Sequence, residues 1–312
     1  MRTPMDVGKQ HAKELSFNTH SRRLYVNCAS GLGNRLRAYA SAAALAESRN
    51  MALHVVWVPD HHFNGNMDDL FDVTSIDVID FDPVKMLSPS TTLFYDDMKE
   101  GRANTIMDKS SDKDIYVRTP FSLSTESKID YRLFAKHIVG LRPLPEIKEL
   151  VRRHIAKLPA PIENFVAVHI RHEGNFFADV PKDNEPVMRN GAYEVSRYRK
   201  LCNEESFVTA ILNRMRTDPT VHFLVATDSP DVLVTLRSIA SRNVHMLDYS
   251  LSVYCRSGAT RDIQCLRFAL VELLALSRCG KGLIWSHMSS YSEILKVFFD
   301  ESNRSNGCYN AE

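Results

Sequence analysis

The segment LYVNCASGLGNRLRAYASAAALAESRNMALHVVWV, residues 24–58, decides the fold class. Residues 24–28 form a short apolar run that predicts a buried strand. Residues 34–49 are rich in alanine and leucine and carry charged residues on the other face, which predicts a helix. Residues 52–58 predict a second strand, ended by Pro59. A strand, a helix and a second strand in this order predict a parallel pair with a right-handed crossover.

The rest of the chain extends this alternation. Residues 60–140 are more irregular, with short strands predicted in SIDVIDF and KDIYVRTPF. From about residue 150 strands and helices alternate, which is typical of an open α/β sheet. The elements expected there are a helix at 144–158, a strand at 160–171, a helix at 203–216, a strand at 221–228, a helix at 230–241, a strand at 243–247, a helix at 262–279, a strand at 281–286 and a helix at 290–300.

This pattern predicts an α/β protein with two Rossmann-like domains and a ligand cleft between them. We expect a polar N-terminal arm over residues 1–22. The N-terminal domain would cover residues 23–145, and the C-terminal domain would cover residues 146–312.

Composition narrows the function classes. The 312 residues include 39 Lys and Arg against 38 Asp and Glu. Without a basic excess, we expect no binding to nucleic acid or to anionic membranes through bulk charge. No apolar run reaches the roughly 18 residues that span a bilayer, and residues 1–20 lack the apolar core of a signal peptide. We therefore expect a cytoplasmic protein, or a chain from which an anchor has been removed.

The six cysteines show no CxxC pair. Several lie inside apolar segments, where a cysteine behaves as a small core residue. Cys255 and Cys265 flank a polar loop, so they are the one pair that we consider for a disulfide.

The glycine loop SGLGNRLR, residues 30–37, follows the first strand. Gly31 and Gly33 match the start of a dinucleotide fingerprint, but Leu36 occupies the third small-residue position, and no Gly-Lys-Ser/Thr follows. Two glycines, the carboxamide of Asn34 and the nearby arginines suit a phosphate or a sugar hydroxyl at a helix N-terminus. The alternative is a tight turn with solvated arginines.

The segment VAVHIRHEGN, residues 166–175, carries the second motif. Strand alternation places His169 and Arg171 on one side near the carboxyl end, which faces the ligand crevice of a parallel sheet. Arg171 could bind a diphosphate bidentately, and His169 could donate to a base or a phosphate. Glu173 and Asp179 follow as candidate general bases. The alternative for His169 is a hydrogen-bonded core residue.

Two further motifs end later strands. In FLVATDSPDV, residues 223–232, Asp228 or Ser229 can cap the following helix. Glu272 interrupts an apolar helix and requires exposure or a partner. Ser289 and Ser290 begin the last helix, where hydroxyls and free amides can bind an anion or simply cap the helix.

Taken in order, GLGNRLR, HIRHEGN, ATDSPDV and LSRCGKGLIWSHMSS resemble the motifs of the GT-B fold fucosyltransferase superfamily. That group includes protein O-fucosyltransferases, core α1,6-fucosyltransferases and bacterial nodulation fucosyltransferases. The resemblance covers residues 24–295 as islands, and the shared order and spacing are its specific part.

The resemblance implies an enzyme that transfers fucose from GDP-fucose to a hydroxyl of a glycan or protein, with inversion and without a metal or cofactor. The N-terminal domain would face the acceptor, and the C-terminal domain would bind the nucleotide sugar. Arg171 would hold the β-phosphate, with His169 and Glu272 near the guanine. Ser289 and Ser290 would bind phosphate oxygens. The expected donor-binding residues are Gly31, Gly33, Asn34, Arg35, His169, Arg171, Asp228, Glu272, Ser289 and Ser290. The expected catalytic residues are Arg171, Glu173 and Asp179.

The chain also departs from the family pattern. His172 stands where the second arginine of His-x-Arg-Arg is found, and Arg35 replaces the glutamine of the glycine loop. The core enzymes carry a glutamate ten residues after the motif histidine, where this chain has Asp179, while Glu173 is nearer. The base assignment therefore stays open. A non-catalytic sugar-nucleotide-binding protein and an NAD(P)-dependent Rossmann oxidoreductase are the alternative functions.

Overall fold

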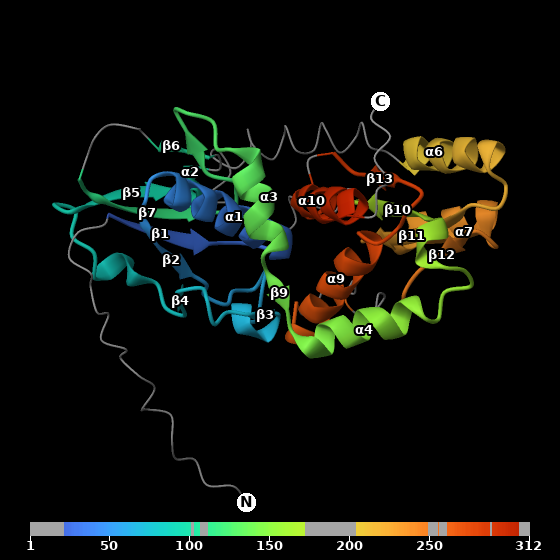
Figure 1. The fold of residues 1–312 in the computed structure, drawn as a ribbon, viewed down its shortest axis with the longest axis horizontal. Helices are drawn as coiled ribbons and strands as arrows, with labels where there is room; N and C mark the ends of the chain where they lie inside the picture. Colours follow the sequence, from blue (N-terminus) through green and yellow to red (C-terminus); the bar gives the residue numbers. More distant parts are fainter. Residues whose placement is uncertain are drawn as a thin grey trace, which may run out of the picture.

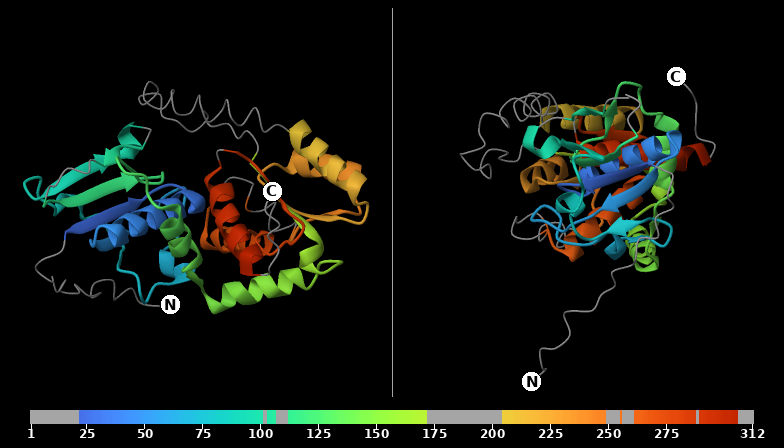
Figure 2. Two further views of the ribbon diagram at one scale, coloured as in Figure 1. Left: turned by 45° about the horizontal axis from the view of Figure 1, so that its top comes forward. Right: turned by 90° about the vertical axis from the view of Figure 1, so that its left-hand side faces the viewer.

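The computed structural model describes residues 22–100, 103–106, 112–171, 204–248, 255, 261–287 and 289–305. Among these residues, a five-stranded and a four-stranded β-sheet lie on either side of a central group of helices (Figure 1). Further views confirm that the helices stand between the sheets (Figure 2). The pairings within both of these sheets are parallel. The prediction of an α/β protein with parallel sheets is confirmed.

The N-terminal sheet has the order β4-β2-β1-β7-β5. Its strands are β4 (Val78–Ile79), β2 (Ala52–Val56), β1 (Arg23–Cys28), β7 (Asp114–Thr119) and β5 (Thr92–Asp96). Helices α1 (Leu32–Ser48) and α3 (Tyr131–Val139) pack together beside it. The predicted strand-helix-strand unit is therefore β1, α1 and β2, with β1 and β2 parallel.

The C-terminal sheet has the order β12-β11-β10-β13. Its strands are β12 (Val244–His245), β11 (His222–Thr227), β10 (Phe165–Ile170) and β13 (Leu283–Trp285). One face packs on α6 (Glu204–Thr217) and α7 (Pro230–Ala240), and the other on α9 (Ile263–Leu276) and α10 (Ser290–Ser305). Burial on both faces explains the nearly continuous apolar sequence of β10.

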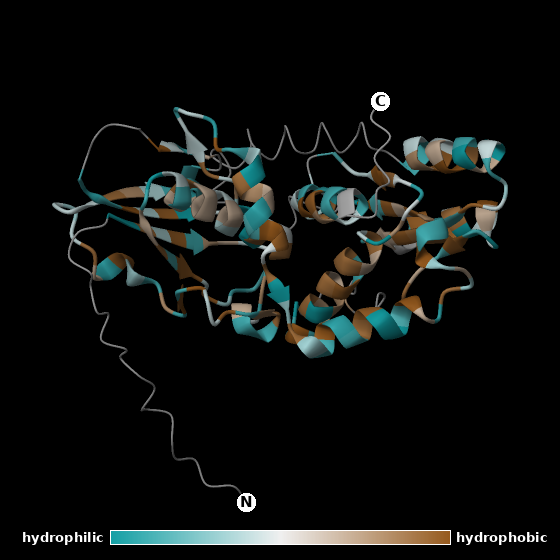
Figure 3. Ribbon diagram, in the orientation of Figure 1, coloured by the Kyte–Doolittle hydropathy of each residue, from teal (hydrophilic) through white to brown (hydrophobic). Residues whose placement is uncertain are grey.

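Shorter elements connect these layers. Helix α4 (Pro145–Ile155) packs on α9; its two-coloured surface contrasts with the mostly apolar α9 (Figure 3). Strand β3 (Phe71–Asp72) pairs antiparallel with β9 (Arg142–Pro143), and β6 (Thr105–Ile106) pairs with β8 (Ser124–Thr125). The remaining short elements are η1 (Met67–Asp69), η2 (Pro83–Lys85), α2 (Asp97–Glu100) and η3 (Ile162–Asn164).

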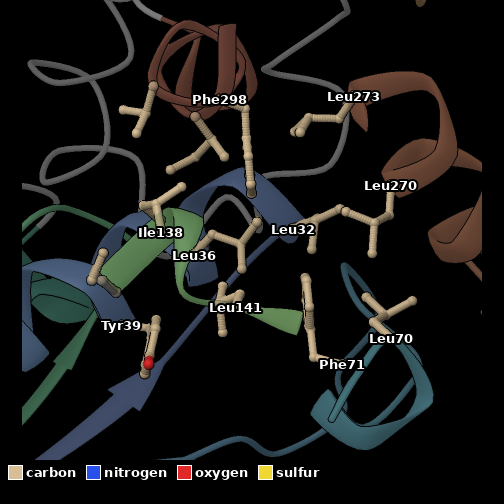
Figure 4. Close-up of a cluster of buried hydrophobic side chains, with 14 of the residues drawn as sticks. Leu32, Leu36, Tyr39, Leu70, Phe71, Ile138, Leu141, Leu270, Leu273 and Phe298 are labelled. Atoms are coloured by element: carbon tan, nitrogen blue, oxygen red, sulfur yellow. The ribbon is translucent and has the colours of Figure 1, made fainter. Parts of the chain in front are cut away.

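One apolar cluster joins the two sheets. Leu36 of α1 and Ile138 of α3 belong to the same buried cluster as Leu270 of α9 and Phe298 of α10 (Figure 4). Helix α10 therefore returns from the C-terminal sheet to pack on α1 and α3. The predicted division at residue 145 is not tested by this packing and stays a prediction.

Sequence periodicity missed several elements of the irregular region. The longest of them are strand β5 and helix α3, which both lie within residues 60–140. Helix α3 has a start signal, because the Asp130 side chain accepts a hydrogen bond from the backbone N–H of Arg132. Its buried residues Phe134, Ala135 and Ile138 also follow helical spacing. The surrounding polar loops obscured this short pattern.

The predicted cysteine roles can be checked at four positions. Cys28 and Cys279 are buried core residues, and burial raises the pKa of the Cys28 thiol to about 12. Cys255 and Cys265 form a disulfide with their Cα atoms 5.2 Å apart, as the polar loop between them suggested. Among the described helices, none is both long and apolar enough to cross a membrane.

Gly33 allows a close backbone approach between helices α1 and α10. A β-carbon at this position would lie 2.6 Å from the backbone nitrogen of Tyr291 and 2.7 Å from the carbonyl carbon of Ser290. Backbone atoms in a helix cannot move aside as the end of a flexible side chain can. The first turn of α1 therefore rests directly on the first turn of α10.

Arg35 is fully buried, although arginine is seldom found in a protein core. Its Nε donates to the carbonyl of Ser30 at 2.8 Å, and its Nη2 donates to the carbonyl of Val58 at 2.8 Å and to Asp60 at 2.9 Å. The guanidinium also lies over the rings of Trp57 and Phe63. It thereby ties the loop after β1 to the loop after β2.

We expect Gly33→Ala to destabilise the protein by about 1–3 kcal/mol, because the new methyl group overpacks the α1–α10 contact. Chemical denaturation followed by circular dichroism measures the change. Ser48→Ala, at the exposed end of the same helix, is the control and should stay within about 0.5 kcal/mol of the wild type. Equal stability of Gly33→Ala and Ser48→Ala would contradict the close contact.

We expect Arg35→Met to cost about 3–5 kcal/mol of unfolding free energy, because it leaves Asp60 and two carbonyl groups without their donor. The matched control is Arg152→Met, since the Arg152 side chain is 71% exposed on α4. A stable Arg35→Met protein that had lost nucleotide binding would instead support the donor role expected from the sequence.

Candidate functional site

Arg171 and Asp228 meet at the carboxyl ends of two neighbouring strands. Arg171 directly follows β10 and Asp228 directly follows β11, and their side chains form an ion pair. Both remain partly exposed, with 32% and 27% of the side-chain surface accessible. The backbone N–H of Arg171 donates to the buried hydroxyl of Ser286 at 2.8 Å, which fixes the end of β10 against the segment after β13.

His169 is a buried and hydrogen-bonded residue. Its Nδ1 lies 2.6 Å from the hydroxyl of Ser292 on α10, and its ring stacks on Tyr291 at 4.6 Å. The Tyr291 hydroxyl donates to the carbonyl of Ala269 on α9. Burial first, and then the nearby charge of Glu272, raises the pKa of Tyr291 well above its usual value. The structure thus brings His169 and Glu272 into one cluster around Tyr291.

The N-terminus of α10 lies beside this cluster. The buried hydroxyl of Ser289 accepts a hydrogen bond from the backbone N–H of Ser292 at 3.4 Å, so Ser289 caps the helix. Ser290 is the first helical residue and is half-buried. The capping alternative therefore holds for Ser289, while its contact with phosphate stays a prediction. Ser229, rather than Asp228, caps α7 through Val232.

The opening glycine loop turns through Ser30, which has a φ of 70° in the left-handed region. Gly31 is the N-cap residue of α1 and gives it no side-chain cap, and no acidic residue stands in the first turn. Asn34 is half-buried and donates to the hydroxyl of Ser30 at 3.1 Å. Gly31 and Asn34 therefore lie at a helix N-terminus. The helix dipole and the free backbone N–H groups favour an anion at this position.

The prediction for Arg35 needs correction. We expected its guanidinium to face the nucleotide sugar, but it is buried and bonded to the two loops described above. Arg37 is similarly engaged, because it donates to the carbonyl of Pro120 and to Glu293 of α10. The sequence showed two arginines at a helix start, and both stabilise the structure because carbonyl oxygens from other segments lie within their reach.

Arg261 is a candidate site residue that the sequence motifs did not reveal. Its Nη1 would lie 3.3 Å from a β-carbon on Gly31, and its carbonyl accepts from the backbone N–H of Asn64 at 3.1 Å. Arg261 is exposed as a residue. Surrounding protein atoms nevertheless desolvate its guanidinium, which lowers the pKa of Arg261, and the positive charge of Arg171 lowers this pKa further. Asp228 and Asp60 oppose that shift. No motif marks Arg261, since its partners come from distant segments.

Two predicted catalytic residues lie outside the described residues. Glu173 and Asp179 belong to the range 172–203, so the base assignment stays a prediction. Across the described ranges, His, Cys, Asp and Glu side chains form no group of three or more that could hold a metal ion.

The arrangement places positive charge near the start of α1. Arg171 stands at the end of β10, and Arg261 lies against the uncapped start of α1. The α10 N-terminus packs against Gly33 on the same helix α1. Guanidiniums and helix N-termini bind phosphate groups well. These residues can therefore bind a multiply charged anion such as a diphosphate.

Comparisons with known proteins agree with the fold. No family model matches the sequence, and no curated protein sequence matches it. Among solved structures, a fucosyltransferase NodZ from Bradyrhizobium is similar, with 15% identity, a TM-score of 0.56 and coverage of 89% of this chain and 93% of that one. A NodZ α-1,6-fucosyltransferase co-crystallised with GDP gives the same identity and TM-score, with coverage of 89% and 92%.

A structure of POFUT1 in complex with GDP-fucose is also similar. It has 11% identity and a TM-score of 0.54, and the alignment covers 92% of this chain and 96% of that one. Similarity at this level of identity establishes the fold and leaves the chemistry to be argued from the site. The chain therefore has the fold of these fucosyltransferase structures over nearly its whole length.

Proposed function

We propose that this protein is a glycosyltransferase that transfers fucose from GDP-fucose to a hydroxyl group of a glycan or protein. The observation that carries the proposal is the meeting of Arg171, the α10 N-terminus and the start of α1 at the carboxyl ends of parallel strands. The similar structures were solved with GDP and with GDP-fucose, which supports the same donor class here.

We also propose the GT-B arrangement, with two Rossmann-like domains divided near residue 145 and a donor cleft between them. The two separate parallel sheets support it, and so does the packing of α10 on α1 between them. In this arrangement α10 belongs to the C-terminal sequence but packs on the N-terminal helices, and so connects the two domains.

The chemistry follows from charge development. As the bond between fucose and diphosphate breaks, negative charge grows on the diphosphate while the anomeric carbon becomes cationic. Arg171 would stabilise the leaving diphosphate without a metal, assisted by the α10 N-terminus. In an inverting transfer, a carboxylate on the opposite face of the sugar takes the proton of the acceptor hydroxyl. Glu173 and Asp179 are the candidates for that base.

The guanine would be recognised beside Tyr291. Glu272 is half-buried on α9, and its carboxylate can accept from the N1–H and the 2-amino group of guanine. His169, held by Ser292, would fix the floor of this pocket. Adenine and uracil do not present that pair of donors, so the site should prefer GDP.

A panel of GDP, UDP, ADP and NAD, measured by thermal shift and calorimetry, tests the donor class. We expect GDP alone to stabilise the protein strongly. A preference for UDP would contradict the donor assignment, and a response to NAD alone would support the oxidoreductase alternative. Binding of GDP without transfer to any acceptor and without hydrolysis would support a non-catalytic binding protein.

We expect Arg171→Ala to lower turnover of GDP-fucose about 100-fold or more with the fold intact, because it removes a main stabiliser of the leaving group. Release of GDP measures the rate, and a thermal melt checks the fold. Arg152→Ala removes an exposed arginine from α4 and is the matched control. Turnover near the wild-type rate in Arg171→Ala would contradict the site.

We expect Glu272→Gln to weaken GDP binding by about 10- to 100-fold, since a charged acceptor for two guanine donors becomes a neutral amide. Binding of inosine diphosphate, which lacks the 2-amino group, should fall less. Calorimetry with both nucleotides measures the difference. An equal loss for the two nucleotides would place the guanine elsewhere.

A further inference from the structure

Arg261 lies where four segments of the chain meet. Its guanidinium contacts the glycine loop at Gly31, and its backbone holds the loop at Asn64. Its charge interacts with Arg171 after β10 and with Asp228 after β11. The first two segments belong to the N-terminal sheet and the last two to the C-terminal sheet. Arg261 therefore contacts the N-terminal half of the proposed donor site, and its charge interacts with the C-terminal half.

The charges around Arg261 alternate in sign. Arg35 pairs with Asp60 at 2.9 Å, and Arg171 pairs with Asp228. The charges of both carboxylates and of Arg171 act on Arg261, whose guanidinium lies near Gly31. Arg171 and Arg261 are therefore two like charges in one neighbourhood, and such a pair is stabilised by anions placed between them.

The arginines of this region fall into two kinds. The Arg35 side chain is 1% exposed, and backbone carbonyl groups hold its guanidinium. Arg171 is 32% exposed and pairs with a carboxylate side chain, and Arg261 is also exposed. A carboxylate side chain can rotate away when a stronger anion arrives, whereas a backbone carbonyl in a packed loop cannot. Arg171 and Arg261 are thus accessible to a ligand, and Arg35 is not.

The backbone of Arg261 is well fixed for a binding role. Asp262 caps α9 by accepting from the backbone N–H of Cys265 at 2.9 Å. The disulfide between Cys255 and Cys265 closes the segment that contains Arg261. Preorganisation of this kind lowers the entropy cost of holding a long side chain on a ligand.

We propose that Arg261 is a second diphosphate-binding residue of the donor site, which acts together with Arg171. Asp228 holds the Arg171 guanidinium in place before the donor binds. This inference rests on the proposed function, because it assigns a phosphate contact within that site.

Calorimetry of GDP and GMP with the full chain tests the proposal. We expect Arg261→Ala to weaken GDP binding by about 10- to 100-fold, as expected for loss of a charge-assisted contact. GMP should lose less, because it lacks the β-phosphate. Arg261→Lys should fall between the wild type and Arg261→Ala, since it keeps the charge and loses the bidentate fork. The control is Arg278→Ala, which removes one positive charge at the exposed end of α9.

The outcomes separate this inference from the proposed function. If the wild type binds GDP and Arg171→Ala loses it while Arg261→Ala binds within about threefold of the wild type, the inference is overturned and the proposed function stands. If the wild type binds no GDP, both are overturned. An equal loss of GDP and GMP binding in Arg261→Ala also overturns the diphosphate contact. If Arg261→Ala does not fold, Arg261→Lys carries the comparison by the same criteria.

Discussion

The absence of a side chain at residue 33 is the constraint on which the site depends. The first turn of α1 can touch the first turn of α10 only because Gly33 has no β-carbon. That contact places the glycine loop after β1 beside the helix that begins at Ser290 and carries Tyr291 and Ser292. His169 is held by Ser292, so the geometry of β10 is linked to the same contact. One backbone approach therefore aligns segments that lie far apart in the sequence.

The arginines show how identical side chains acquire different roles. Arg35 and Arg37 stand two residues apart on α1, and each reaches carbonyl oxygens of distant loops. Their energy contribution is structural, because burial makes an unpaired guanidinium very costly. Arg171 pairs with the carboxylate of Asp228 and stays partly exposed at the end of β10. Burial and backbone partners thus fix Arg35 and Arg37 in the fold, whereas exposure leaves Arg171 accessible for the proposed ligand.

The similar structures share the fold of this chain, but the fold alone does not determine the activity. A TM-score of 0.56 at 15% identity means that the chain path is shared while most side chains differ. Fold similarity alone is compatible with several activities. The proposed choice of a GDP-sugar as donor therefore depends on residues at the strand ends and at the helix N-termini. Our proposal adds Arg261, which lies just before α9, to that set.

Hydrophobic periodicity determined the order of strands and helices, because a buried face must repeat with the geometry of its element. It predicted β1, α1 and β2 and most of the alternating elements from α4 to α10, and it placed Arg171 and Asp228 at strand ends. The short helix α3 and strand β5 lay in polar surroundings and were missed. Tertiary structure alone decided that Arg35 is buried and that Arg261 lies beside Gly31 of the glycine loop. Local sequence sets which faces are apolar, whereas the partner of a long charged side chain comes from whichever distant loop the packing brings within its reach.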